Sequence, residues 1–177
     1  MIGDIVVLLP LVVLQGWLTS HSRELAIAIE VPMVVLYSAY TIYGHGRFGQ
    51  TVGKYLVGIR VLRVSGSNIG WREAWLRSSL DIVFACLSAL STLVALSQIP
   101  DAQYYGVGMM QRAANLNAYN PSWLDWVAIA ANIWIWSEVL IILFNKKRRS
   151  LHDFIAGTVV VSDAKTSQVG VASVLPA

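Results

Sequence analysis

The sequence predicts an all-α membrane protein with four transmembrane helices, a small cytoplasmic two-strand element and a short interfacial helix. Three observations predict this class. First, 56% of the 177 residues are hydrophobic and only 13% are charged, a composition outside the range of ordinary soluble domains. Second, four apolar runs approach the roughly 20 residues that cross a hydrocarbon core. Third, a block of basic residues, 146–149, directly follows the last of these runs.

The four predicted spans lie at residues 2–19, 25–43, 76–97 and 123–144. The first run contains Asp4, lacks a basic segment before it and lacks a small-residue cleavage site. We therefore expect it to be a retained span and not a secretory signal. Only residues 20–24 separate the first two runs, which predicts a tight antiparallel helix pair.

The positions of lysine and arginine predict the orientation of the chain. Six of these residues lie within residues 44–77, and five more lie in the C-terminal segment as Lys165 and the block at 146–149. The remaining two are Arg23 and Arg112. Because Lys and Arg beside a span stay on the cytoplasmic side, we expect both termini to be cytoplasmic and the chain to lie in the plasma (inner) membrane. These basic residues border apolar runs and form no stripe on a polar domain, so nucleic acid is not expected as a partner.

The segment between the second and third spans is too polar to cross a membrane. Residues 49–57 predict an interfacial helix whose Lys54 reaches lipid headgroups. Residues 58–64, GIRVLRV, then predict a strand that a turn at SGSN ends. A second strand is predicted at residues 157–161. Since a lone strand leaves its backbone unpaired, we expect the two strands to form a small cytoplasmic sheet.

Three segments, GQTVGKYLVGIRVLRVSG, REAWLR and RRSLHDFIAGTVVV, resemble the RDD family of small integral membrane proteins. The positions that match the family motif are Asp4, Gly53, Lys54, His152, Asp153, Gly157 and Thr158. The resemblance implies an RDD-like transmembrane domain over residues 1–162, followed by a flexible cytoplasmic tail at 163–177. It also implies transport, which in some members is exchange of sodium or other monovalent cations for protons.

The family is named after one arginine and two aspartates, and Asp4 and Asp153 match the two aspartates. The resemblance places the arginine at the start of the first helix. It has no counterpart here, because only Met1, Ile2 and Gly3 precede Asp4. Two explanations stay open: the natural start lies upstream and supplies the arginine, or this member has lost it.

Ionisable residues in the spans are the candidates for an ion or proton path. An acidic side chain at the centre of a span costs roughly 2.5–3.5 kcal/mol, so it normally faces the bundle interior, pairs, or lines an aqueous path. The candidate path residues are Asp4, Glu30, Arg77, Asp81 and Glu138.

These candidates differ in their surroundings. Arg77 and Asp81 stand four residues apart, so they could pair with each other or share a bond with Asp4; a purely structural role is favoured for them. Glu138 has no cation three or four residues away, so we expect it to be a lone acid that is protonated part of the time and suits a proton or cation site. Glu30 precedes Pro32, where a harmless kink is favoured over a cation site made of freed carbonyls.

The second cytoplasmic segment contains two further candidates. His152 could titrate near neutral pH and sense protons. Asp153 is expected to cap a short helix that ends at Gly157, with a salt bridge to Arg60 or Arg63. Of the other residues, His45 is expected to be solvated, and Cys86, the single cysteine, is expected to be a small buried packing residue.

Two functions from different classes follow. The leading interpretation is a carrier of monovalent cations or protons, which would work as a homo-oligomer because four helices enclose little volume. The alternative is a non-transporting scaffold or accessory protein that binds anionic lipid or a partner through its basic cytoplasmic face.

Functions other than the carrier and the scaffold have less support in the sequence. A third interpretation is an outer-loop receptor that uses Tyr104, Tyr105, Met109 and Met110, but these residues are more readily explained as a cover for the outer end of the bundle. No enzyme activity, cofactor or metal site is expected. The stretch QTVGKY resembles a phosphate-binding loop but departs from it at Phe48 and Tyr55.

Overall fold

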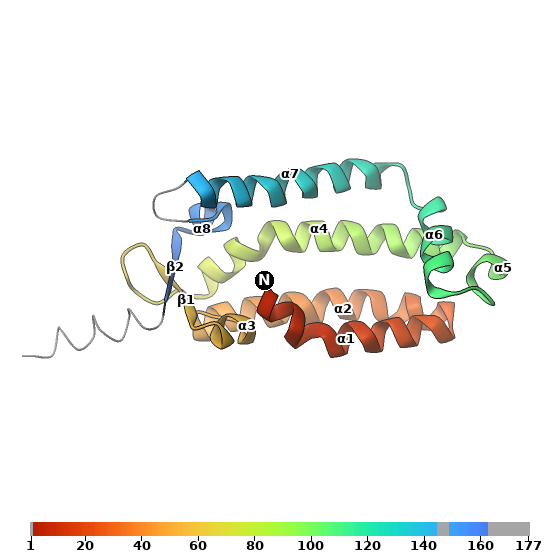
Figure 1. The fold of residues 1–177 in the computed structure, drawn as a ribbon, viewed down its shortest axis with the longest axis horizontal. Helices are drawn as coiled ribbons and strands as arrows, with labels where there is room; N and C mark the ends of the chain where they lie inside the picture. The colour runs from red at the N-terminus through yellow and green to blue at the C-terminus, as the bar shows by residue number, and fades with distance from the viewer. Residues whose placement is uncertain (1, 145–148, 163–177) are drawn as a thin grey trace, which may run out of the picture. The chain divides into compact units, whose positions relative to one another are not determined.

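The computed structural model describes residues 2–144 and 149–162. The order of its helices and strands is shown in Figure 1. The predicted tail at 163–177 and the first three residues of the basic block, Lys146, Lys147 and Arg148, lie outside the described residues.

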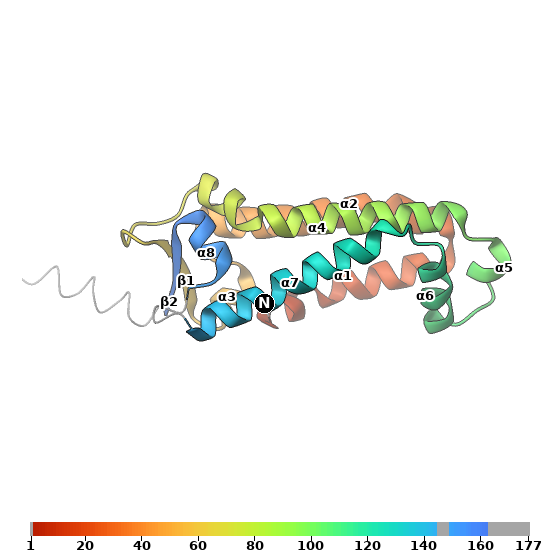
Figure 2. The ribbon, with the colours of Figure 1, turned by 90° about the horizontal axis from the view of Figure 1, so that it is seen from above.

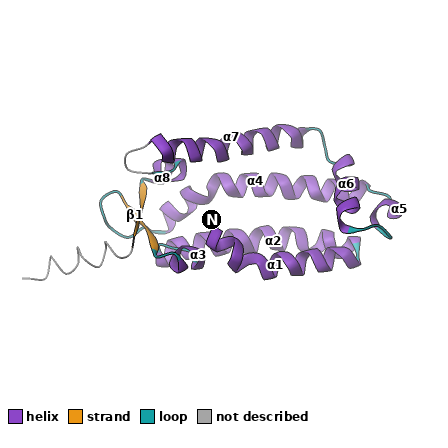
Figure 3. Cartoon of the chain, viewed as in Figure 1, coloured by secondary structure: helices purple, strands orange, loops and turns teal. Residues whose placement is uncertain are grey.

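Four long helices account for most of the described chain, and Figure 3 shows that helix is its dominant secondary structure. They are α1 (Ile2–His21), α2 (Arg23–Tyr43), α4 (Trp71–Gln98) and α7 (Trp123–Phe144). Four described stretches are long and apolar enough to cross a membrane, with mean hydropathies between 1.4 and 2.0: Asp4–His21, Arg23–Phe48, Trp71–Gln98 and Trp123–Ile141. The predicted number and order of spans are therefore confirmed.

Hydrogen bonds at the helix ends explain why the observed helix bounds differ from the predicted bounds of the spans. Only Ser22 separates α1 from α2, and its hydroxyl accepts a hydrogen bond from the backbone N–H of Leu25 at 3.1 Å, which caps α2. At its other end, α2 continues into a π-helical turn, η1 (Gly44–Phe48). Helix α4 begins at Trp71, five residues before the predicted start, because Glu73 in its first turn accepts a hydrogen bond from the backbone N–H of Gly70 at 2.8 Å.

The chain divides into two compact units. The described residues of the first unit are 2–9, 39–79, 136–144 and 149–162. Its strands β1 (Ile59–Arg63) and β2 (Thr158–Ser162) pair antiparallel, with Val61 opposite Val160, as seen in Figure 2. The predicted two-stranded sheet is therefore confirmed.

In the sequence, a short helix of the first unit precedes each of these strands. Helix α3 (Val52–Leu56) lies inside the predicted interfacial helix and begins at Thr51, whose hydroxyl accepts from the backbone N–H of Lys54. Helix α8 (Leu151–Ala156) precedes β2 and ends at Gly157, which has a positive φ of 66°. The turn at Gly157 allows the chain to pass directly from the helix into the strand.

The second unit contains residues 10–38 and 80–135. The segment predicted as an outer loop forms two short helices, α5 (Asp101–Tyr104) and α6 (Met109–Ala118). Tyr104 packs in a buried cluster with Ala26, Leu96 and Ile99, and its hydroxyl donates to the carbonyl of Thr19 at 2.5 Å. The covering role predicted for Tyr104 is thus confirmed, whereas Met109 and Met110 are exposed.

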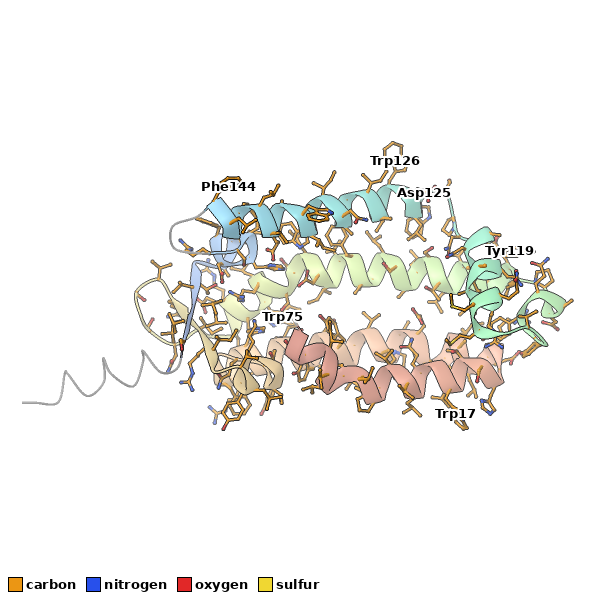
Figure 4. All side chains as sticks on the ribbon, viewed as in Figure 1. Trp17, Trp75, Tyr119, Asp125, Trp126 and Phe144 are labelled. Atoms are coloured by element: carbon orange, nitrogen blue, oxygen red, sulfur yellow. The ribbon has the colours of Figure 1, made fainter. Side chains whose placement is uncertain are left out.

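Large apolar side chains remain exposed along the long helices. Trp126 is 74% exposed and Phe144 is 85% exposed, and Figure 4 shows that Trp17, Trp126 and Phe144 project away from their own helices. Cys86 is also exposed, so the predicted burial of this residue was wrong. Exposed apolar surface on this scale is unfavourable in water and is what a surface in contact with lipid requires.

Candidate functional site

A set of buried polar side chains in the first unit forms the candidate site. Each of these residues, taken as a whole, is at most 8% exposed, and we call them the polar cluster: His45, Gln50, Thr51, Arg77, Ser78, Asp153 and Thr158. Buried polar groups are stable only when they hydrogen-bond or pair with an opposite charge. The partners of these side chains therefore decide what the cluster can do.

Arg77 and Asp153 form an ion pair at the centre of the polar cluster. The side chain of Arg77 on α4 is 9% exposed and that of Asp153 on α8 is 1% exposed, and Nη1 of Arg77 donates directly to Oδ1 of Asp153. The same nitrogen donates to the hydroxyl of Thr158 at 2.6 Å, and this hydroxyl donates to Oδ1 of Asp153 at 2.9 Å. The three side chains join α4, α8 and β2 in one closed hydrogen-bonded triangle.

Asp153 also caps α8, as predicted. Its Oδ2 accepts from the backbone N–H of Ser150 at 3.0 Å, while the Ser150 hydroxyl accepts from the backbone N–H of Asp153, which completes a capping box. The predicted salt bridge to Arg60 or Arg63 was wrong. Asp153 is buried against Arg77, and Arg63 pairs with Glu73 on the exposed side.

The ionisation of Asp153 follows from these contacts. Burial alone would raise the pKa of its carboxyl group, but the charge of Arg77 and the hydrogen bonds from Ser150, Arg77 and Thr158 outweigh burial and lower the pKa below its ordinary value. Since arginine keeps its proton under all ordinary conditions, the pair is fixed in its charged form. Asp153 is therefore a structural anion and not a site that exchanges protons near neutral pH.

Arg149 belongs to the same structure. Its Nε donates to the carbonyl of Thr158 at 2.9 Å, and its Nη2 donates to the carbonyl of Asp153 at 3.0 Å. The guanidinium also lies 4.4 Å from the ring centroid of Phe154, in range of a cation–π interaction. The last residue of the basic block thus holds the end of α8 in place, a role that its position in a basic run did not indicate.

His45 and Lys54 form a second pair. Nζ of Lys54 lies 2.6 Å from Nε2 of His45, and Nδ1 of His45 lies 2.7 Å from the carbonyl oxygen of Thr41. Because a carbonyl can only accept, Nδ1 carries the ring proton and Nε2 accepts from the lysine. The predicted solvation of His45 was wrong, since it is 6% exposed, and the prediction that Lys54 reaches headgroups was wrong because its amine faces His45.

Asp4 lies next to this pair. The hydroxyl of Tyr40 donates to Oδ1 of Asp4 at 2.8 Å, and Thr51 also forms a side-chain hydrogen bond with Asp4. Asp4, Lys54 and Arg77 all act electrostatically on His45. The structure thus brings two candidate path residues, Asp4 and Arg77, around one buried histidine that the sequence interpretation had placed in solvent.

Glu138 of α7 has a partner, so the prediction that it is a lone acid was wrong. Its Oε1 accepts from the backbone N–H of His152 at 3.0 Å, and it also contacts Nδ1 of the same residue. The two side chains are 15% and 16% exposed. His152 of α8 therefore contacts Glu138 of α7. This contact could not be inferred from the spacing of residues along α7.

The two remaining candidate path residues lie in the second unit. Glu30 accepts a hydrogen bond from Nε2 of Gln15 at 3.4 Å, between α2 and α1. Asp81 lies on the exposed side of α4. The described residues include no group of three or more His, Cys, Asp or Glu side chains that could hold a metal ion.

Four apolar helices that can span a bilayer, with a polar cluster in one unit, define an integral membrane protein. The model of the RDD family matches residues 1–157, and the chain belongs to the RDD family. No curated protein and no solved structure matches the chain significantly.

Proposed function

We propose that this RDD protein lies in the plasma membrane with both termini in the cytoplasm and carries protons or monovalent cations across it. The observation that supports this most is the contact between Glu138, an acid inside the span Trp123–Ile141, and His152 on α8. An acid in a span is costly, and here it contacts a histidine, the side chain type that most often serves as a proton donor and acceptor in proteins.

The chemistry of the pair suits reversible binding. With His152 protonated, the pair is an ion pair; with His152 neutral, the contact with Nδ1 no longer carries a positive charge. The carboxylate still accepts the backbone hydrogen bond at 3.0 Å and can then bind a proton or a monovalent cation. The contrast with Asp153 is informative, because the partner of Asp153 is an arginine that does not release its proton. Glu138 and His152 are thus the proposed exchange site, and Arg77 and Asp153 are the proposed support.

The other candidates extend this proposal. Asp4 lies beside the His45–Lys54 pair, in which the half-buried lysine amine donates to the buried imidazole. Glu30 and Asp81 remain predicted members of the path in the second unit, and assembly as a homo-oligomer remains a prediction. A scaffold that binds anionic lipid or a partner is the alternative, since the Arg77–Asp153 pair serves a scaffold equally well.

The test is a flux assay on the full chain reconstituted in liposomes, with a pH or sodium gradient as the driving force. The wild type is expected to dissipate the gradient, and Glu138→Gln is expected to abolish this activity. The matched control is Asp125→Asn, which makes the same chemical change to an exposed acid near the other end of α7 and should leave flux unchanged.

Absence of flux in folded wild-type protein would overturn the carrier and favour the scaffold. In that case, neutralising Lys146, Lys147 and Arg148 while Arg149 keeps its bonds to Thr158 and Asp153 should abolish binding to anionic lipid, and Glu138→Gln should have no effect. The orientation is tested separately by labelling single cysteines introduced near the C-terminus in intact cells, where access to an impermeant reagent would contradict a cytoplasmic tail.

A further inference from the structure

We propose that a polar pocket of the first unit binds a phosphate group, and that this group belongs to an anionic lipid headgroup. The pocket has a volume of about 280 Å³. It lies where the end of η1, strand β1 and the segment before α4 meet, and its polar lining comes from Arg47, Gly49, Gln50, Arg60 and Asn68. This site is distinct from the Glu138–His152 pair and goes beyond the proposed transport.

Two guanidinium groups give the pocket its charge. Arg47 and Arg60 line it, and none of its described lining residues is acidic. Within residues 2–144 and 149–162, the side chain of Arg47 makes no hydrogen bond or ion pair and is exposed. The planar guanidinium matches the oxygens of a phosphate in a bidentate fashion, so this lining favours a phosphate over a cation or an apolar ligand.

Gln50 supplies an independent sign of a missing ligand. Its side chain is 8% exposed, and its Oε1 is buried with no hydrogen-bond partner among the described residues. A buried amide without a partner is costly, and native structures rarely leave one. Rotation of the amide exchanges its two ends, so Gln50 can donate to a phosphate oxygen or accept from a hydroxyl of a lipid headgroup.

Gly49 explains how the two arginines come to share one pocket. It has a φ of 70°, which favours glycine, and a Cβ at this position would lie 3.1 Å from the carbonyl oxygen of Val61 and 3.4 Å from Cγ of Arg60. The backbone N–H of Val61 also donates to the carbonyl of Gly49 at 2.8 Å. The turn after η1 is therefore fixed to β1, which holds the stem of Arg60 against it.

The aromatic residues around the pocket favour a lipid as the source of the phosphate. Phe48 lines the pocket, and the ring of Tyr43 lies 5.8 Å from that of Phe48 and 6.0 Å from that of Trp71, between centroids. Tyrosine and tryptophan at the ends of membrane helices mark the headgroup level. The volume is near the lower limit of small-molecule pockets, which suits a headgroup better than a nucleotide.

The experiment measures binding to the detergent-solubilised full chain by native mass spectrometry. Phosphatidylglycerol, diacylglycerol without a phosphate, and inorganic phosphate are added separately. We expect phosphatidylglycerol to bind and diacylglycerol not to bind, and we expect Arg47→Gln or Arg60→Gln to weaken phosphatidylglycerol binding about tenfold or more, as loss of a charge-assisted hydrogen bond requires.

The control is Arg72→Gln, which removes the same charge from an exposed residue that does not line the pocket and should bind like the wild type. Equal weakening by all three variants would show a general surface attraction and overturn the site. Binding of inorganic phosphate with the same dependence on Arg47 but without binding of phosphatidylglycerol would overturn the lipid assignment. Equal binding of diacylglycerol and phosphatidylglycerol would overturn the phosphate site altogether.

Discussion

Removal of one partner of the Arg77–Asp153 pair should cost a large part of the stability of the first unit. In Arg77→Met, the carboxylate of Asp153 stays buried, because its side chain is 1% exposed, but it loses its charge partner among the described residues. It also loses the donor that reaches Thr158. Loss of one member of a buried ion pair typically costs about 3–5 kcal/mol. Because whole domains are stable by only about 5–15 kcal/mol, we expect clear destabilisation of this variant.

A double variant separates the effect of the unpaired charge on stability from the effect of lost side-chain packing. Arg77→Met with Asp153→Asn removes both charges, and the new amide keeps an oxygen that can accept from the backbone N–H of Ser150, where Asp153 now accepts at 3.0 Å. Replacement of a whole buried pair by neutral groups is often close to neutral. We therefore expect the double variant to be more stable than Arg77→Met alone.

The assay is denaturant or thermal unfolding in detergent, with Arg72→Met as the control because Arg72 is an exposed arginine near the start of the same helix. The control should unfold like the wild type. If Arg77→Met unfolds like the wild type, the pair does not stabilise this unit. The same follows if the double variant loses as much free energy of unfolding as Arg77→Met and Asp153→Asn lose together.

Three further predictions concern the ionisation of Asp153, the turn at Gly157 and the hydroxyl of Tyr104. Because the pKa of Asp153 is lowered below 3.8, ionisation of its carboxyl group stabilises the fold above pH 3.8, and this contribution is lost as the pH falls through the lower pKa of the folded state. The difference in free energy of unfolding between wild type and Asp153→Asn should therefore shrink only in that acidic range. Gly157→Ala places a side chain at a φ of 66° and should cost about 1–2 kcal/mol, whereas Gly16→Ala, in open helical surroundings, should be neutral or stabilising; equal effects in unfolding assays would contradict the backbone argument. Tyr104→Phe removes the donor to Thr19 and should cost about 1 kcal/mol, while Tyr55→Phe, at an exposed tyrosine, should leave the unfolding midpoint unchanged.

The spans and the sheet could be predicted because each depends on neighbouring residues. A hydrocarbon core requires a minimum apolar length, and that requirement places α1, α2, α4 and α7 from hydropathy alone. The sheet followed from the need to pair the backbone of a lone strand. The start of α4 was misplaced because Arg72 and Glu73 lower the local hydropathy, although Glu73 caps the helix through Gly70.

The partners in the polar cluster could not be predicted because local rules reach only about four residues along a helix. Arg77 and Asp153 are 76 residues apart, so the sequence pointed only to Asp81, four residues along the helix, and to Asp4 as partners of Arg77. The cap by Asp153 was predicted correctly, since its partner is Ser150. His45 was placed in solvent because the sequence gives no sign that α2 continues into the turn of η1.

The two aspartates that the resemblance matches to the family name, Asp4 and Asp153, differ in what they can do, and the difference lies in their partners. Asp153 faces a guanidinium that keeps its proton, so its charge is fixed and its role is to hold α8 and β2 to α4. Asp4 accepts from a neutral tyrosine and lies near a lysine whose amine donates to the buried His45. Glu138 likewise faces an imidazole. Where the partner can gain or lose a proton, the charge of the pair can change, as the proposed transport requires, and where it cannot, the pair can only support the fold. A variant of Glu138 should therefore lose flux while it keeps its stability, and a variant of Arg77 should lose its stability first.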